Sequence, residues 1–195
     1  MATRNPHKTC ELQQILGSEF TVRDLHAYPE ISEITETGTS FQENAKLKAL
    51  AVSRKLPGLV IADDSGLEVD ALGGAPGIYS ARYAGTNTTN KERIDKLLEE
   101  LARVDPTKEQ RGARFRCVLA LARNGEVLGI FEGIVDGQIV DRPRGSRGFG
   151  YDPIFVPNGF QQTFGQLEPA EKNQLSHRAR ALEKLRAFLN SRPNQ

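Results

Sequence analysis

The sequence predicts an α/β protein with a mixed β-sheet flanked by helices, and three observations support this. Two segments begin with a helix-capping pattern and continue with apolar residues at spacings of three and four. Two strand-like apolar runs are joined by Asn124-Gly125, a dipeptide that favours a tight hairpin turn. Helix and strand signals alternate along the chain, which is typical of helices packed on the faces of one sheet.

Composition and charge set the broad class of the protein. The chain has 195 residues, 38% of them hydrophobic, which is enough for one core or for one domain with a small second lobe. Lys and Arg total 26 against 25 Asp and Glu, and this net charge of +1 gives no support for broad binding to nucleic acid or membranes. No apolar run reaches the roughly 20 residues that span a bilayer, and the N-terminus lacks a signal-peptide core. Cys10 and Cys117 form no CxxC pattern, so we expect reduced thiols in a cytoplasmic protein.

Helix signals occur at four places along the chain. Residues 40–43 (SFQE) read as a capping box that opens a helix, and Pro-Gly at 57–58 should end it. Residues 89–92 (TNKE) open a second helix in the same way. A third helix is expected over about 176–190, where apolar residues recur on one face. A shorter pattern at 11–16 indicates a further helix close to the N-terminus.

Strand signals fall between these helices. Five strands are expected, at residues 59–62, 115–121, 127–135, 138–140 and 154–156. Asn124-Gly125 predicts a hairpin between the second and the third. Asp136-Gly137 repeats this turn chemistry and predicts a further turn before the fourth strand. The strands around these two turns would form an antiparallel meander.

Two adjacent carboxylates, Asp63 and Asp64, follow the first predicted strand. At about 4 Å, two such charges repel by roughly 4 kcal/mol at an effective dielectric constant near 20. Proteins accommodate such a pair when the carboxylates share a proton, bind a divalent cation or point apart. Hard cations such as Mg²⁺ bind one or two carboxylates together with substrate phosphates. The alternative is a strand-to-turn junction in which Asp and Ser65 cap backbone donors, and the residues alone leave both readings open.

A polar motif, TRNPHK, begins at Thr3. Short polar side chains and backbone N–H groups followed by Lys8 can bind phosphates, especially where a helix begins just after them. The alternative is a capped helix with a solvated lysine. Only Met1 and Ala2 precede the motif, so the strand from which a phosphate-binding loop normally extends is expected to be very short or trimmed.

A loop rich in arginine and glycine, RPRGSRGFGYDP, covers residues 142–153. Its glycines allow the backbone to approach a ligand closely, and arginine suits phosphate or carbonyl acceptors. Phe149 and Tyr151 follow, and an exposed aromatic side chain can stack on a base. The alternative is a flexible loop whose aromatic side chains pack into the core. Three arginines with three glycines exceed what a tight turn needs, which favours ligand binding.

Basic residues also gather where the last predicted helix begins, in EKNQLSHRAR at residues 171–180. Lys172, His177 and Arg178 are placed there, although a helix N-terminus already carries partial positive charge. This mismatch indicates an anionic or carbonyl-rich ligand. A lone histidine at a helix start would otherwise be an ordinary surface residue.

Together these motifs resemble the inosine triphosphate pyrophosphatase family, which hydrolyses noncanonical purine nucleoside triphosphates. The similarity runs in order through nearly the whole chain, in the segments TRNPHK, ETGTSFQENAKLKA, IADDSGLEVDALGGAPGIYSARYAG, ARFRCVLAL, GFGYDPIF and EKNQLSHRARAL. It implies an elongated mixed sheet with helices, formed as two lobes around a central substrate cleft within a single domain over residues 1–195. It also implies a homodimer.

The resemblance further implies roles for individual residues. Asp64 would accept a proton and, together with Glu36, hold Mg²⁺. The family commonly has two acids before the TG of this motif, and here Thr35 replaces the first. Substrate binding is implied for Thr3, Arg4, Asn5, Pro6, His7, Lys8, Ser65, Phe149, Gly150, Tyr151, Asp152, Lys172, His177 and Arg178. Among these, Thr3, Asn5 and Lys8 would bind the triphosphate, and Phe149 would stack on the purine. Three others, Lys172, His177 and Arg178, would read the base.

The implied reaction is Mg²⁺-dependent hydrolysis of ITP, dITP and XTP at the α-phosphorus, which releases pyrophosphate and the nucleoside monophosphate. No nucleic-acid polymer or membrane is implied as a partner. One alternative is a nucleotide-binding regulatory protein without turnover, which would not need Asp64. Another is a pyrophosphatase for modified pyrimidines, and Lys172 together with the SHR segment favours purines over these.

Overall fold

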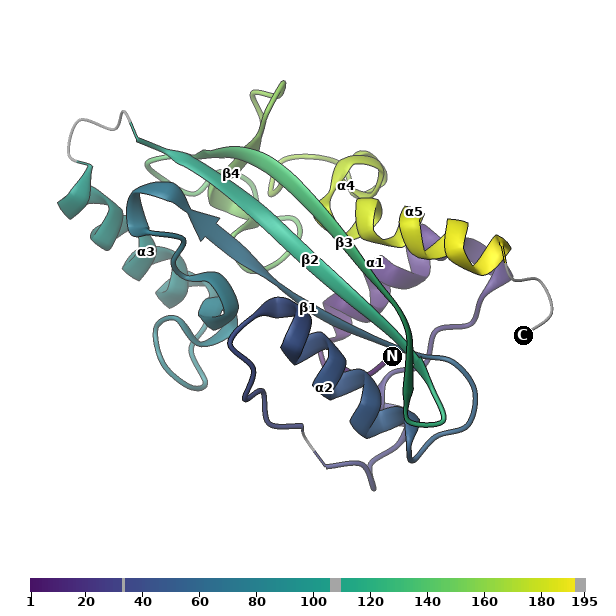
Figure 1. The fold of residues 1–195 in the computed structure, drawn as a ribbon. Coiled ribbons are helices and arrows are strands. Elements are labelled where there is room, and N and C mark those ends of the chain that lie inside the picture. Colours follow the sequence, from purple (N-terminus) through teal and green to yellow (C-terminus); the bar gives the residue numbers. More distant parts are fainter. Residues whose placement is uncertain (33, 106–109, 192–195) are drawn as a thin grey trace. The chain divides into compact units, whose positions relative to one another are not determined.

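The structure, a computed structural model, describes residues 1–32, 34–105 and 110–191 (Figure 1). It contains a four-stranded antiparallel sheet in the order β1-β2-β3-β4, with helices packed around it, and this confirms the predicted α/β class. The strands are β1 (Val60–Val69), β2 (Gly112–Arg123), β3 (Glu126–Ile139) and β4 (Phe155–Pro157). The α-helices are α1 (Pro6–Leu16), α2 (Phe41–Ser53), α3 (Asn90–Val104), α4 (Pro169–Leu175) and α5 (His177–Asn190).

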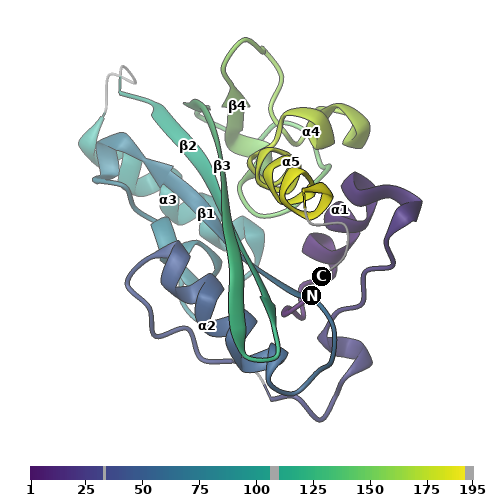
Figure 2. The same cartoon turned by 45° about the vertical axis from the view of Figure 1, so that its right-hand side comes forward.

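The chain divides into two compact units. Unit 1 comprises Met1–Asp64, Cys117–Gly133 and His177–Gln195, and unit 2 comprises Ser65–Arg116 and Ile134–Ser176. In unit 1, α1 and α5 pack side by side on one face of the strands, and α2 lies on the other face (Figure 2). The buried core of unit 1 includes Leu12, Leu119, Leu121, Leu182 and Leu185. In unit 2, the buried stripe of α3 packs on an aromatic cluster, and this core includes Ile94, Leu97, Leu101, Phe115, Phe155 and Phe164.

Local sequence chemistry explains most element boundaries. Asn124 and Gly125 form the β2–β3 turn with φ angles of 52° and 80°, which confirms the predicted hairpin. The capping box at Thr89 is present, with its side chain and that of Glu92 each bonded to the other's backbone. Ser40 caps α2 by accepting a hydrogen bond from the Glu43 N–H group, and the Glu43 carboxylate also accepts hydrogen bonds from the N–H group and the hydroxyl of Thr39. α2 ends at Ser53, before the Pro-Gly at 57–58.

Two strand predictions are wrong, and each has a physical reason. β1 does not end at residue 62 but continues through the acid pair to Val69, because ion-pair partners allow the two carboxylates to lie within a buried strand. Residues 136 and 137 do not form a turn either, since β3 continues through them to Ile139. Gly137 lies there because β4 approaches closely: a Cβ atom at this position would lie 2.3 Å from the Val156 carbonyl oxygen.

The C-terminal helical region is divided. The helix expected over 176–190 is α5, and a separate seven-residue helix, α4, precedes it. Ser176 separates α4 from α5, because its backbone is extended (φ −66°, ψ 159°). Lys172 therefore lies on α4, whereas His177 and Arg178 are the first residues of α5.

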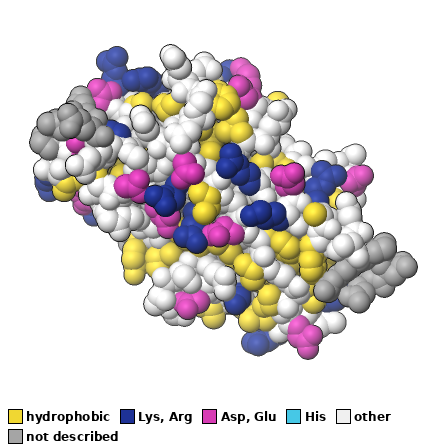
Figure 3. Space-filling view, turned by 45° about the horizontal axis from the view of Figure 1, so that its top comes forward, with side chains coloured by type: hydrophobic (Ala, Val, Ile, Leu, Met, Phe, Trp, Pro, Cys, Tyr) yellow, Lys and Arg dark blue, Asp and Glu magenta, His cyan; other side chains and the backbone are white. Residues whose placement is uncertain are grey.

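The surface carries charges of both signs. Figure 3 shows Lys and Arg side chains interspersed with Asp and Glu side chains over the described part of the face that it draws. No helix among the described residues combines the length and the apolar character needed to cross a bilayer.

Candidate active site

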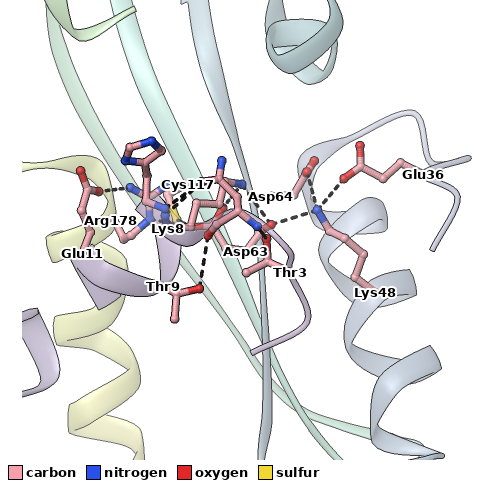
Figure 4. Close-up of polar contacts among 12 residues, drawn as sticks. Thr3, Lys8, Thr9, Glu11, Glu36, Lys48, Asp63, Asp64, Cys117 and Arg178 are labelled. Atoms are coloured by element: carbon pink, nitrogen blue, oxygen red, sulfur yellow. Dashed lines mark hydrogen bonds and ion pairs between the residues drawn. The ribbon is translucent and has the colours of Figure 1, made fainter. Parts of the chain in front are cut away.

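Asp63 and Asp64 lie side by side on β1 in unit 1, and their side chains are 0% and 8% exposed. Asp63 forms ion pairs with Lys8 of α1 (2.5 Å to Nζ) and with Arg178 of α5 (2.8 Å to Nε). Asp64 instead accepts a hydrogen bond from Nζ of Lys48 on α2, at 2.8 Å (Figure 4). The two carboxylates thus contact different helices, as strand alternation predicts, and the strand-to-turn alternative is wrong.

Asp63 is held as a carboxylate by two cationic side chains. Burial alone would raise its pKa, but the charges of Arg178 and Lys8 outweigh burial and hold the pKa of Asp63 well below its usual range. The Cys117 thiol lies 3.4 Å from the same carboxylate. Burial, reinforced by the charge of Asp63, raises the pKa of Cys117 well above its ordinary value, so Cys117 remains a protonated thiol.

Asp64 has a different environment from its neighbour. Burial raises the pKa of Asp64, and the ammonium group of Lys48 offsets this only in part. Its Oδ2 atom is buried without a hydrogen-bond partner among the described residues. A buried carboxylate oxygen left in this state is expected to receive a ligand or a proton. Neighbouring carboxylates whose pKa values are driven apart are a recurrent feature of acid–base sites.

Lys48 links the acid pair to Glu36, the other carboxylate that was expected to hold metal. Its Nζ atom donates to Glu36 Oε1 (2.6 Å), to Asp64 Oδ1 (2.8 Å) and to the backbone oxygen of Asp63 (2.9 Å). Sequence reasoning missed this lysine. The signal was present, because Lys48 lies three residues after Ala45 and four before Val52, on the buried stripe of α2.

Arg178 is fully buried at the start of α5. Its guanidinium group is paired with Asp63 and with Glu11 of α1, a second residue that sequence reasoning missed. The first turn of α5 lies directly on β3, since a Cβ atom at Gly133 would be 2.0 Å from the His177 carbonyl oxygen. The positive charge placed at this helix start is therefore compensated by carboxylates of the protein itself. We name Lys8, Glu11, Glu36, Lys48, Asp63, Asp64 and Arg178 the acid–base cluster.

The N-terminal motif both caps a helix and directs a lysine into the cluster. Asn5 is the N-cap of α1, and its side chain accepts hydrogen bonds from the backbone N–H groups of His7 (3.0 Å) and Lys8 (3.4 Å). The Thr3 hydroxyl accepts one from the Asn5 N–H group at 3.1 Å. The capped-helix alternative is thus correct for the backbone, but Lys8 is not merely solvated, because it binds Asp63.

The motif also contains Arg4, Pro6 and His7. Arg4 donates to the backbone oxygens of Leu25 (2.9 Å) and Ile31 (2.6 Å), so its guanidinium group fixes the loop that follows α1. Pro6 and His7 are exposed at the start of α1. Met1 and Ala2 precede the motif without forming a strand element, although the Ala2 N–H group bonds the Ile61 backbone oxygen at 2.8 Å.

Unit 2 contains part of the set of residues expected around the base. The buried carboxylate of Asp152 accepts hydrogen bonds from the Phe149 N–H group (2.8 Å) and from Lys172 Nζ (2.6 Å). The Lys172 ammonium also lies 5.3 Å from the centroid of the half-buried Phe149 ring. Tyr151 packs into the core and donates its hydroxyl to the Ser80 backbone oxygen at 3.0 Å, as the alternative for this loop predicted.

The residues implied to bind nucleotide therefore fall in both units. Ser65 and Gly150 belong to unit 2, and Gly150 adopts a positive φ of 62° in the turn between Phe149 and Asp152. His177 is buried and belongs, like Arg178, to unit 1.

The carboxylates of the acid–base cluster suit a hard cation whose remaining ligands come from substrate phosphates. No group of three His, Cys, Asp or Glu side chains is assembled for a metal within the described ranges. Glu36 and Asp64 nevertheless supply two carboxylates around one point, and Asp64 Oδ2 has no hydrogen-bond partner within residues 1–32, 34–105 and 110–191. Mg²⁺ commonly takes one or two carboxylates, with phosphate oxygens and water completing its shell.

An apolar cavity of about 270 Å³ also lies in unit 1. Leu12 and Leu16 of α1, Val60 of β1 and Leu185 of α5 contribute to its lining, which includes no member of the acid–base cluster.

Comparison with known proteins identifies the family. The model of the Ham1 family matches residues 1–188. The chain belongs to the Ham1 family. Among its relatives, the dITP/XTP pyrophosphatase of Shouchella clausii is 50% identical over 186 residues, covering 95% of this chain and 93% of the relative. The dITP/XTP pyrophosphatase of Bacillus subtilis is 48% identical over 190 residues, covering 97% and 95% respectively.

Solved Ham1 structures share the fold of this Ham1 chain. The HAM1 protein of Coxiella burnetii superposes with a TM-score of 0.86 at 42% identity, covering 97% of this chain and 96% of that structure. The Staphylococcus aureus Ham1 protein superposes with a TM-score of 0.85 at 41% identity, with the same coverage. The resemblance inferred from the sequence motifs is therefore confirmed at the level of family and fold.

Proposed function

We propose that this Ham1 chain hydrolyses noncanonical purine nucleoside triphosphates, namely ITP, dITP and XTP, to the monophosphate and pyrophosphate, and thereby removes them from the nucleotide pool. The observation that supports this most strongly is the asymmetry of the acid pair. Asp63 is ion-paired with two cationic side chains, whereas Asp64 has a raised pKa and an Oδ2 atom without a hydrogen-bond partner in the described part of the chain. The names of the relatives, dITP/XTP pyrophosphatase, agree with this assignment.

In this mechanism Asp64 orients a water molecule and accepts its proton as the water attacks the α-phosphorus. Its raised pKa makes it a stronger base than an exposed aspartate. Lys8 stabilises charge on the phosphates, and the N-terminus of α1 beside it adds a partial positive charge. Asp63 holds Lys8 in position through its 2.5 Å ion pair.

Glu36 and Asp64 would hold Mg²⁺ together with substrate oxygens. When bound, Mg²⁺ supplies positive charge that neutralises the leaving pyrophosphate. The chain's own contribution is to keep two carboxylates and the backbone oxygen of Asp63 around one point, at distances of 2.6 to 2.9 Å from Lys48 Nζ.

Base selection would rest on donors to the 6-oxo group. Inosine and xanthosine carry this acceptor where adenine carries an amino donor. Arg178 or Lys172 would donate a hydrogen bond to the oxo group, whereas the amino group of adenine would present a second donor to the same side chain, which costs affinity. Phe149 would stack on the purine, and His177 would complete the contact. We assign these residues to a substrate cleft in a single two-lobed domain, acting as a cytoplasmic homodimer.

A nucleotide-binding regulatory protein without turnover is the competing function. Such a protein would need the phosphate and base contacts but no buried carboxylate with a raised pKa. The environment of Asp64 therefore favours the enzyme.

A panel of nucleotides incubated with Mg²⁺ and assayed for pyrophosphate tests the proposal. We expect kcat/KM for ITP, dITP and XTP to exceed that for ATP by about a hundredfold or more, since a site built to bond an oxo group rejects an amino group strongly. Orthophosphate must be assayed in parallel. Binding of dITP without release of either product would instead support the regulatory function.

A further inference from the structure

The ammonium group of Lys48 is enclosed by three oxygen atoms. Its acceptors are a carboxylate oxygen of Glu36 (2.6 Å), one of Asp64 (2.8 Å) and the backbone oxygen of Asp63 (2.9 Å) (Figure 4). An ammonium group has three hydrogens, so each of them is engaged. Lys48 is 8% exposed, and it can bind a substrate phosphate only by giving up one of these acceptors.

The same three oxygens are of the type that a hard divalent cation selects. Mg²⁺ takes carboxylate and carbonyl oxygens at about 2.0–2.1 Å, so a modest contraction of this shell would suit it. Asp64 Oδ2 adds a fourth oxygen, which is buried and lacks a partner among the described residues. The lysine therefore lies where the donor set would place a cation.

A divalent cation bound by these oxygens would lie within about 4 Å of the ammonium group, where like charges repel strongly. We propose that Lys48 occupies the cation position in the nucleotide-free protein, and that it must leave when Mg²⁺ binds. The released ammonium group needs an anion, and the phosphates of the nucleotide supply one. Metal and nucleotide would then favour each other's binding, because both require the displaced lysine. This inference rests on the proposed function, since it assumes a phosphate-bearing substrate at the acid–base cluster.

Mn²⁺ binding to the nucleotide-free protein tests the exchange without any turnover. Lys48→Met removes the resident cation and leaves the oxygens in place, so we expect Mn²⁺ to bind about tenfold more tightly than to the wild-type protein. The dissociation constant would be measured from the electron paramagnetic resonance signal of free Mn²⁺. Lys46→Met is the matched control, because it removes one positive charge from the same helix outside the acid–base cluster. It should leave Mn²⁺ affinity within about twofold of wild type.

Lys48→Gln provides a second variant that keeps hydrogen-bond donors at the position but removes the charge. Circular dichroism would verify that both variants are folded. Unchanged or weaker Mn²⁺ binding in the folded variants would overturn the exchange. If the wild-type protein still releases pyrophosphate from dITP in that case, the proposed function stands and the inference alone fails. A wild-type protein that turns over no nucleotide would overturn the proposed function, whatever the result with Mn²⁺.

Discussion

Asp64→Asn should abolish pyrophosphate release from dITP while leaving nucleotide binding largely intact. The amide has nearly the shape of the carboxylate but cannot accept the proton of the attacking water and is a poor ligand for Mg²⁺. Loss of a general base alone typically lowers kcat by about 10²–10⁴. Pyrophosphate release in a single turnover, together with dITP binding by calorimetry, would separate the two effects.

A surface aspartate provides the control for this substitution. Asp95 is 53% exposed on α3 and pairs with Lys91, so Asp95→Asn should retain full activity. Full activity in Asp64→Asn would remove Asp64 from the mechanism. Loss of dITP binding in that variant would instead make Asp64 a binding residue.

Arg178→Ala should lower the free energy of unfolding by about 3–5 kcal/mol, because it leaves two carboxylates without their buried guanidinium partner. Asp63 would lose its 2.8 Å ion pair and Glu11 would lose its partner on α5. In the fraction that folds, the preference for ITP over ATP should decrease, since a donor to the 6-oxo group is removed. Urea unfolding measures the first effect, and the ratio of kcat/KM values for ITP and ATP measures the second.

Arg180→Ala is the matched control for Arg178, because Arg180 is an exposed arginine on the same helix. It should change neither quantity appreciably. If Arg178→Ala lowers the free energy of unfolding but leaves the ratio of kcat/KM for ITP and ATP unchanged, Arg178 has a structural role only and does not contact the base. Unchanged stability would contradict the importance of the buried ion pairs.

Local patterns in the sequence predicted the elements well where the determinants are local. The hairpin at Asn124-Gly125, the capping box at Thr89 and the inward faces of the helices depend on residues a few positions apart. The course of β1 does not. Whether Asp63 can lie in a buried strand depends on Arg178, 115 residues further along the chain, and no local pattern contains this pairing.

Asp136-Gly137 is a second place where a local sequence pattern could not predict the structure. A glycine that makes a turn and a glycine that admits a neighbouring strand look identical in sequence. Here the second reading is correct, because β4 packs where a Cβ atom of Gly137 would lie.

The sequence predicted most of the charged residues of the candidate site, but not which of them form ion pairs with one another. Motifs indicated Lys8, Glu36, Asp64 and Arg178, all of which belong to the acid–base cluster in unit 1. Lys48 was missed because the buried face of α2 was predicted from its hydrophobic residues alone. A charged residue at a buried position of a helix is itself a signal of an oppositely charged buried partner.

Hydrolysis of dITP in water enriched in ¹⁸O most directly tests the assignment of attack to the α-phosphorus. If Asp64 activates water against that atom, mass spectrometry should find one ¹⁸O atom in the nucleoside monophosphate and none in the pyrophosphate. Label in pyrophosphate would place the attack at the β-phosphorus. Formation of the nucleoside diphosphate and labelled orthophosphate would place it at the γ-phosphorus, and either result would contradict the proposed reaction.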